Sequence, residues 1–197
     1  SRIKGIWCVP VYSNPDGIVY DETTCRRLAS MAAAPDFRIF WDNAYGQHHL
    51  YPEHKASVPD MLELCDKAGH PDRVYTFTST SKITYAGAGV ACMAASPANL
   101  AYRKQVMFYQ TIGHDKMNQL RHVRFLGDLA GVEQHMEKHA AILRPKFEAV
   151  LGLLEEELSN TGIAHWNKPM GGYFISLFAY PGTATKTVEA ARACGVE

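Results

Sequence analysis

The sequence has no excess of charge of either sign. Twenty lysine and arginine residues balance twenty aspartate and glutamate residues in a chain of 197 residues, and no run of like charge stands out. Binding to nucleic acid or to an anionic membrane surface usually depends on a basic patch, so this balance argues against both partners. Small molecules or other proteins are the partners that we expect.

Long apolar runs and paired cysteines are also lacking. The five cysteines are odd in number and widely spread: Cys8, Cys25, Cys65, Cys92 and Cys194. None forms a C-x-x-C pair, which argues against a zinc knuckle or a disulfide framework. No apolar run approaches the length of a membrane span, and residues 1–10 lack the apolar stretch of a signal peptide. These absences favour a cytoplasmic protein with reduced thiols.

The order of apolar runs and turn residues predicts an α/β fold. The expected strands cover residues 3–11, 36–42, 73–78 and 89–95, and the expected helices cover residues 21–33 and 57–69. Alternation of strands and helices at this rhythm indicates a mainly parallel sheet flanked by helices. Since a strand is expected as early as residue 3, the chain resembles a fragment that begins in the middle of a fold.

The second half of the chain is expected to be mostly helical. Residues 132–158 place apolar side chains along one helix face, and Pro145 should kink or divide that helix. Ser57 is the expected cap of the helix at 57–69. Residues 165–180 read as a turn that leads into a strand, and residues 185–195 as a last helix.

These elements predict three parts. Residues 1–130 form a large domain that lacks its N-terminal part, residues 131–160 a connecting helix, and residues 161–197 the start of a smaller α+β domain.

Polar residues follow the ends of three expected strands. Asn14, Asp42 and Lys82 should gather at one edge of a parallel sheet, where ligands usually bind. Lys82 is either a solvated strand-end lysine or a desolvated amine that attacks a carbonyl group. Ser79 and Ser81 precede it and, with nearby main-chain N–H groups, could form a nest for a phosphate.

The other polar residues of this edge also allow a structural and a functional interpretation. Asp42 is either a turn cap or the partner of a positive charge on a bound heterocycle. Tyr45, three residues further on, can donate to a ring oxygen. Asn14 by itself indicates only a turn.

The order and spacing of these residues resemble fold-type I pyridoxal-phosphate enzymes, specifically the class I aminotransferases. The matching motifs are N-P-x-G at Asn14, D-x-A-Y at Asp42, S-x-S-K ending at Lys82, and P-x-G-G-x-F at residues 169–174. The sequence segments "STSKITYAGAGV" and "NQLRHVRFL" are similar to those of a bacterial subgroup of aspartate-type aminotransferases. The resemblance covers nearly the whole chain.

The resemblance implies a role for each residue of the edge. Lys82 forms the Schiff base with pyridoxal 5'-phosphate, and Asp42 pairs with its pyridine nitrogen. Asn14 and Tyr45 bind its phenolic oxygen, and Ser79 binds its phosphate. The implied activity transfers an amino group between aspartate, or a similar dicarboxylic amino acid, and a 2-oxo acid. A homodimer with shared active sites is also implied.

The sequence departs from the family pattern in three places. Val90 stands where the family has an arginine that grips the phosphate, so Thr78 or Ser81 would have to replace it. The family's glycine-rich phosphate loop and the aromatic residue that stacks on the ring fall before residue 1. No arginine after residue 174 matches the one that clamps the substrate carboxylate, since Arg192 lies in an expected helix. By itself the chain should therefore be inactive.

Three alternatives use the same residues differently. A dinucleotide turn at Gly87 and Gly89 is rejected, because Cys92 replaces the third glycine and no acidic residue follows at the required distance. A non-catalytic domain with a vestigial pocket stays open. So does another reaction on the same cofactor, such as a lyase or decarboxylase step, because Lys82 and Asp42 would serve it equally.

The remaining polar features are given structural interpretations. His48 and His49 are adjacent without a spaced third ligand, and His135 and His139 lack the glutamate of a zinc protease motif, so no metal is expected. In the resembling family the segment about thirty residues after the lysine approaches the partner subunit. Its polar residues Lys116, Asn118 and Arg121 could touch the partner's site, although a polar helix surface is the preferred interpretation.

Overall fold

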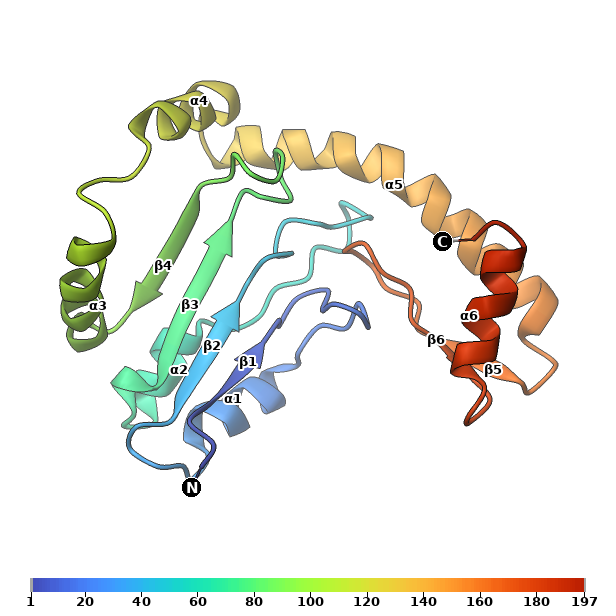
Figure 1. Ribbon diagram of the computed structural model, residues 1–197, viewed down its shortest axis with the longest axis horizontal. Coiled ribbons are helices and arrows are strands. Elements are labelled where there is room, and N and C mark those ends of the chain that lie inside the picture. Colours follow the sequence, from blue (N-terminus) through green and yellow to red (C-terminus); the bar gives the residue numbers. More distant parts are fainter. Residues whose placement is uncertain (1, 197) are drawn as a thin grey trace.

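The structure is a computed structural model that describes residues 2–196 (Figure 1). Four strands form the main sheet: β1 (Gly5–Cys8), β2 (Arg38–Asp42), β3 (Val74–Ser79) and β4 (Ala91–Ala95). They lie in the order β1-β2-β3-β4, with β1, β2 and β3 parallel and β4 antiparallel to β3. The mostly parallel α/β sheet expected from the sequence is confirmed.

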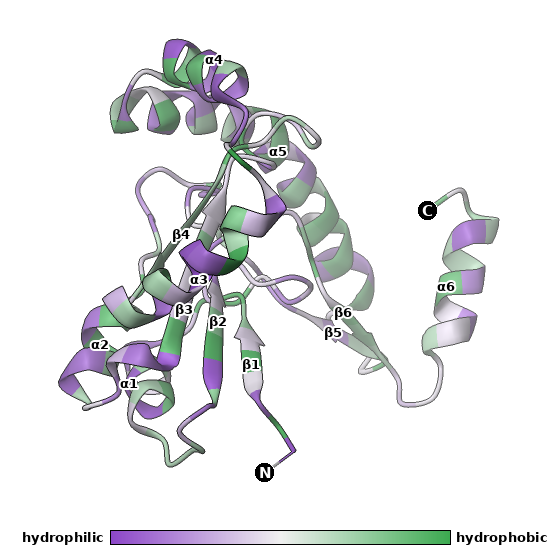
Figure 2. Cartoon of the chain, turned by 60° about the vertical axis from the view of Figure 1, so that its left-hand side comes forward, coloured by the Kyte–Doolittle hydropathy of each residue, from purple (hydrophilic) through white to green (hydrophobic). Residues whose placement is uncertain are grey.

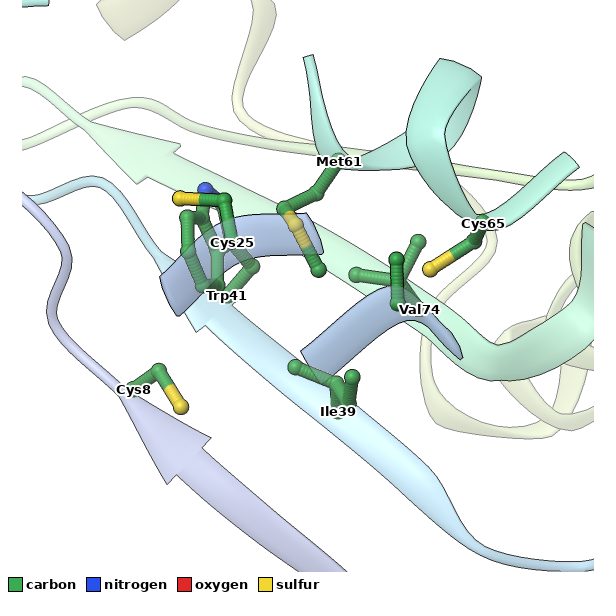
Figure 3. Packing of buried hydrophobic residues seen from close by; sticks show 8 residues of the cluster. Cys8, Cys25, Ile39, Trp41, Met61, Cys65 and Val74 are labelled. Carbon is green, nitrogen blue, oxygen red and sulfur yellow. The ribbon is translucent and has the colours of Figure 1, made fainter. Parts of the chain in front are cut away.

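One face of this sheet is covered by two helices, α1 (Glu22–Ser30) and α2 (Met61–Lys67). Alternate residues of a strand point to opposite faces, and Ile39 and Trp41 of β2 point toward these helices. The side chains that fill the layer between sheet and helices are buried (Figure 3): Cys8, Cys25, Ala29, Ile39, Trp41, Met61, Cys65 and Val74. Three of the five cysteines are thus core residues.

The opposite face of the sheet carries a row of aromatic rings. Trp7, Phe40 and Tyr75 are register neighbours on β1, β2 and β3, and their rings stack. Phe77 extends the row, with its ring centroid 5.9 Å from that of Trp7. Because the side-chain period of a strand is two residues, Asp42 shares this face with Phe40.

The start of α2 differs from the prediction. The helix begins at Met61, and the side chain of Asp60 accepts hydrogen bonds from the main-chain nitrogens of Leu62 and Glu63. The prediction of Ser57 as the cap was wrong, because the Asp60 carboxylate satisfies the free N–H groups of the first turn. Pro59 therefore precedes the helix.

The second half of the chain contains four helices and a small sheet. The elements are α3 (Pro97–Gln110), α4 (Lys116–Leu126), α5 (Leu129–Leu158), β5 (Ala164–Trp166), β6 (Leu177–Ala179) and α6 (Ala184–Ala193), while a short 3-10 helix (Pro71–Arg73) precedes β3 in the first half. Strands β5 and β6 pair antiparallel. Strand β6 lies at the end of residues 165–180, where a turn leading into a strand is predicted, whereas β5 was not predicted. The predicted division into three domains stays a prediction.

Helix α5 runs without interruption through Pro145 for 30 residues (Figure 1). Of the two expectations for this proline, a kink or a division of the helix, the division was wrong and the kink stays a prediction. The turn around it is fixed by other contacts, since Arg144 donates from Nε to the carbonyl of Leu50 at 2.8 Å and Phe147 is buried. The helix thus continues although the proline lacks the N–H of a regular helical hydrogen bond. The predicted inward face of the helix is confirmed, with Met136 also buried.

Hydrophilic and hydrophobic residues alternate along α5 (Figure 2). Within residues 2–196, the structure has no helix with the length and apolar character needed to cross a membrane.

Candidate functional site

The predicted site residues lie at one edge of the main sheet. The loop with Asn14 follows β1, Asp42 is the last residue of β2, Ser79 is the last residue of β3, and Lys82 comes three residues later. Because β1, β2 and β3 are parallel, their carboxyl ends meet at this edge. This is the edge at which open parallel sheets bind ligands.

Lys82 and Tyr45 are brought into direct contact. The Nζ atom of Lys82 lies 5.1 Å from the centroid of the Tyr45 ring. The ring is only 3% exposed and is held by the edges of other rings, from His48, Tyr173 and Phe174. The Lys82 amine is therefore placed over a rigid aromatic surface.

The turn that carries Lys82 has a fixed main chain. The amide nitrogens of Ile83 and Thr84 each donate to the carbonyl of Thr80 at 2.9 Å. The carbonyl of Lys82 itself lies 3.1 Å from Nε2 of His48 and 3.1 Å from the hydroxyl of Tyr173. Two side chains from distant parts of the sequence thus meet on the main chain of this lysine.

His48 is a buried, neutral histidine. Its side chain belongs to a residue only 4% exposed, and burial lowers its pKa from 6.5 to about 4. Nε2 faces the Lys82 carbonyl, so this nitrogen carries the proton and donates. Nδ1 is buried and has no hydrogen-bond partner within the part of the chain that the structure describes. The ring therefore makes its hydrogen bond to Lys82 alone.

Asp42 is held by a neighbouring strand. The indole N–H of Trp7 donates to Oδ2 of Asp42 at 3.3 Å. The register pairs Asp42 with Phe77 on β3, and Ser79 lies two residues further along the same face. The carboxylate thus sits at the end of the aromatic row.

The segment after Lys82 packs tightly onto Ser81. A Cβ atom on Gly89 would lie 2.5 Å from Oγ of Ser81 and 3.0 Å from its main-chain nitrogen, so only glycine fits there. Val90, which stands at the family's arginine position, donates its main-chain N–H to Oγ1 of Thr80 at 2.8 Å. The Thr78 hydroxyl points to the Asn43 carbonyl at 3.4 Å. Whether Ser81 or Thr78 replaces the arginine stays a prediction.

Two other predictions concern the segment after Lys82 and the helix α4 that contacts it. Residues 87–92 lead into strand β4 and not into a helix, which agrees with the rejection of a dinucleotide turn. Asn118 of α4 donates from Nδ2 to the carbonyl of Ala88 at 2.7 Å, so its amide binds its own chain. Lys116 and Arg121 are exposed on α4, and their proposed contact with a partner subunit stays a prediction.

The other predicted residues share the edge without direct contact. Asn14 is exposed in its loop, and that loop is tied to the β5–β6 segment because Ser176 donates to the carbonyl of Pro15 at 2.9 Å. Within residues 2–196, no hydrogen bond joins the side chains of Asn14, Ser79 or Ser81 to those of Asp42, Tyr45 or Lys82. Their roles as site residues stay predictions.

The histidines around the lysine turn form hydrogen bonds. Nε2 of His135 lies 2.9 Å from the Ile83 carbonyl and 3.1 Å from Nε2 of His139. His122 lies 3.0 Å from Oγ1 of Thr80. Among the described residues, no group of three or more histidine, cysteine, aspartate or glutamate side chains is arranged to hold a metal ion.

Sequence reasoning missed three residues that contact the site. Trp7 lies in a strand and reads as a core residue. His48 was considered only as a metal ligand, and its neighbour His49 instead pairs with the Tyr12 hydroxyl at 2.8 Å. Tyr173 lies in the recognised segment 169–174, so that motif could have drawn attention to it.

The chain is similar to known proteins over nearly its whole length. The family model described as aspartate amino-transferase matches residues 1–197. An aspartate aminotransferase of Corynebacterium glutamicum is 47% identical over 196 residues, which cover 99% of this chain and 45% of that protein. A protein of Mycolicibacterium smegmatis is 50% identical over 195 residues, which cover 98% of this chain and 45% of the relative.

A solved structure shows the same arrangement of elements. The crystal structure of an aspartate transaminase from Corynebacterium glutamicum superimposes with a TM-score of 0.95 at 47% identity, over 99% of this chain and 46% of that one. The chain spans less than half the length of these relatives. It belongs to the aspartate aminotransferase family.

Proposed function

We propose that the complete protein is a pyridoxal-phosphate-dependent aminotransferase in which Lys82 is the catalytic residue. Its amino donor would be aspartate or a similar dicarboxylic amino acid, and its acceptor a 2-oxo acid. The observation that carries the proposal is the placement of the Lys82 amine 5.1 Å from the Tyr45 ring centroid, at the carboxyl edge of a parallel sheet. Family membership over the whole chain supports it.

The chemistry of the donor set at this edge fits pyridoxal 5'-phosphate. The Asp42 carboxylate suits a protonated ring nitrogen, and the Tyr45 phenol and Asn14 amide suit a phenolic oxygen. The hydroxyls of Ser79 and Ser81 suit a phosphate, and the close packing of Gly89 on Ser81 keeps that turn compact. The Lys82 amine suits an aldehyde.

Each residue then has a defined task. The cofactor, when bound, supplies an electron-accepting ring next to the substrate's Cα atom. Lys82 would hold the cofactor through its amine and, as a free amine beside the substrate, would move the Cα proton as general base and acid. Asp42 keeps the ring nitrogen protonated by charge pairing. Ser79 and its neighbours fix the phosphate, so that the reacting atoms stay in place.

The proposal also covers the parts of the complete protein that lie outside this chain. The chain covers 45% of its relative from Corynebacterium glutamicum, so the rest of the substrate site would come from other parts of the complete protein or from a partner subunit. A homodimer with a shared site, a cytoplasmic location and the division into domains at residues 130 and 160 stay predictions.

Covalent labelling tests the role of Lys82. The complete protein is mixed with pyridoxal phosphate, the visible absorbance is recorded, and borohydride reduction with peptide mapping locates the attachment. We expect the label at Lys82 and its loss in Lys82→Ala. Lys104→Ala, which removes an exposed lysine of α3, is the matched control and should label normally. A wild-type protein without label, or a label that persists in Lys82→Ala, would contradict the proposal.

Product analysis tests the type of reaction. With aspartate and a 2-oxo acid, an aminotransferase yields a new amino acid and the 2-oxo acid of aspartate in equal amounts. Release of carbon dioxide with formation of alanine would instead indicate β-decarboxylation. A protein that binds the cofactor but yields neither product would be a non-catalytic member of the family.

A further inference from the structure

We infer that His48 and Tyr173 are positioning residues that together hold the main-chain carbonyl of Lys82, an inference that rests on the proposed role of Lys82. The two donors come from different parts of the fold. His48 lies in the loop after β2, and Tyr173 lies between β5 and β6. Each reaches the same oxygen at 3.1 Å. The lysine turn is thereby tied both to the main sheet and to the β5–β6 segment.

Both side chains act as hydrogen-bond donors near neutral pH. Burial keeps His48 neutral with its proton on Nε2, because Nδ1 has no partner within residues 2–196 and Nε2 faces a carbonyl. Burial also raises the pKa of the Tyr173 phenol, with a smaller contribution from Tyr45, so the hydroxyl keeps its proton. A carbonyl oxygen has two lone pairs and can accept both bonds.

The same two rings also fix the surface under the lysine amine. His48 and Tyr173 contact the Tyr45 ring edge-on, with centroids 5.5 Å and 6.1 Å away, and they contact each other at 5.1 Å. The amine of Lys82 lies over that Tyr45 ring. One pair of residues therefore sets the lysine's main chain and the phenol beside its side chain. Neither residue needs to touch the reacting atoms to place them.

The loop of His48 and the segment of Tyr173 are joined to each other as well. The main-chain N–H of Gly172 donates to the carbonyl of His48 at 2.9 Å, and the Leu50 N–H donates to the carbonyl of Met170 at 3.0 Å. A Cβ atom on Gly171 would lie 2.4 Å from the His48 carbonyl oxygen, so a glycine is required for this approach. The two donors thus arrive at Lys82 as one connected unit.

Two donors on one acceptor predict a non-additive response. Loss of either donor leaves the Lys82 carbonyl with the other, whereas loss of both leaves it without a protein donor among the described residues, which should cost more than the loss of one bond. A role of the rings in packing alone predicts that the double variant, which keeps an aromatic ring at both positions, exchanges like the wild type. The double variant therefore separates the two interpretations.

The experiment uses the complete protein and five variants. Tyr173→Phe and His48→Phe each remove one donor, the double variant removes both, and His48→Gln restores an N–H donor near the Nε2 position. Tyr51→Phe, which removes a hydroxyl that bonds to Glu148 on the surface, is the matched control. Hydrogen exchange of residues 80–85 is measured without cofactor, and the rate of covalent attachment of pyridoxal phosphate is measured separately.

We expect each single variant to change the exchange rate of the turn by no more than about twofold, and the double variant to raise it by roughly fivefold or more, as expected for an unpaired acceptor. The attachment rate should fall in parallel, with kcat reduced more than KM changes. His48→Gln, which keeps an N–H donor at this position, should leave both readouts close to those of the wild type. If His48→Phe or the double variant has an altered urea unfolding midpoint, the conclusion rests on His48→Gln and Tyr173→Phe, which change the fewest atoms.

Additive effects, or a double variant whose turn exchanges like the wild type, would overturn the inference. Such results would leave the proposed function intact if Lys82 still carries the label in the wild-type protein. Conversely, a wild-type protein without label would reject the proposed function. The exchange rates of residues 80–85 would still show whether His48 and Tyr173 stabilise the turn that carries Lys82.

Discussion

The indole nitrogen of Trp7 lies 3.3 Å from Oδ2 of Asp42, across the first two strands of the sheet. This contact orients the carboxylate that we propose as the partner of the cofactor's ring nitrogen. The Trp7 ring also stacks on Phe40 and Phe77, with centroids 5.5 Å and 5.9 Å away, so it is held in place although it is 61% exposed.

We predict that Trp7→Phe weakens cofactor binding by roughly fivefold, the size expected for the loss of one hydrogen bond, because the ring stacking is kept and only the N–H is lost. Titration of the complete protein with pyridoxal phosphate measures this effect. Trp166→Phe is the control, since the Trp166 indole nitrogen is buried without a hydrogen-bond partner among the described residues. Equal affinities for wild type and Trp7→Phe would show that Asp42 does not need this donor.

Gly89→Ala should disturb the turn that carries Lys82 through a steric clash with Ser81. The new Cβ atom would lie 2.5 Å from Oγ of Ser81 and 3.0 Å from its nitrogen, so the turn must shift. We predict a loss of stability of about 1–3 kcal/mol, as for overpacking, together with weaker cofactor binding. Urea unfolding and cofactor titration measure the two effects. Gly113→Ala, where a Cβ would meet nothing within 4 Å, should leave both unchanged.

The low pKa of His48 predicts a loss of stability in acid. The folded protein holds this pKa at about 4, against 6.5 for an unperturbed histidine, so between these values the unfolded chain binds the proton more readily. Stability from this group is complete above pH 6.5 and falls as the pH drops toward 4. Between pH 7 and pH 5 the expected loss is about 2 kcal/mol.

Urea unfolding of the wild type and of His48→Gln at pH 7 and pH 5 measures that loss. Burial also lowers the pKa of His49 and His139, so the wild-type change contains their contributions too. The difference between the two proteins isolates His48, because glutamine does not titrate. Parallel pH dependences for both proteins would contradict a buried, neutral His48.

The start of α2 provides a test of helix capping. Asp60→Ala removes the side chain that accepts from the Leu62 nitrogen at 2.8 Å, and should cost about 1 kcal/mol. Ser57→Ala should change the unfolding free energy little, because Ser57 lies outside the helix. Thermal or urea unfolding of the complete protein compares the two. A larger effect at Ser57 would restore the cap predicted from sequence.

Much of the fold followed from local patterns in the sequence. The alternation that placed Ile39 and Trp41 on the helix-covered face, and the order of strands and helices, were enough to predict a mostly parallel sheet. The cap of α2 was missed because Ser57 and Asp60 are both good cap residues, and only the position of Pro59 relative to the helix decides between them. The continuity of α5 was missed because the contact of Arg144 with Leu50 joins residues 94 positions apart.

The positions of Asp42 and Lys82 at the sheet edge were also predictable, while their roles stay predictions. Strand ends gave the positions of Asp42 and Lys82, because the carboxyl edge of a parallel sheet is a consequence of its topology. The contacts of His48 and Tyr173 with Lys82 were not, since they depend on the path of two loops separated by more than a hundred residues. The local pattern of apolar residues carries no information about contacts between such distant loops.

Helix α5 connects the two ends of the molecule as a single rod. Near its start His135 reaches the Ile83 carbonyl at 2.9 Å, and near its end Glu155 pairs with Lys168 at 2.7 Å. A helix of 30 residues is about 45 Å long. Its unbroken passage through Pro145 therefore lets a single element contact both the segment after Lys82 and the segment that joins β5 to β6.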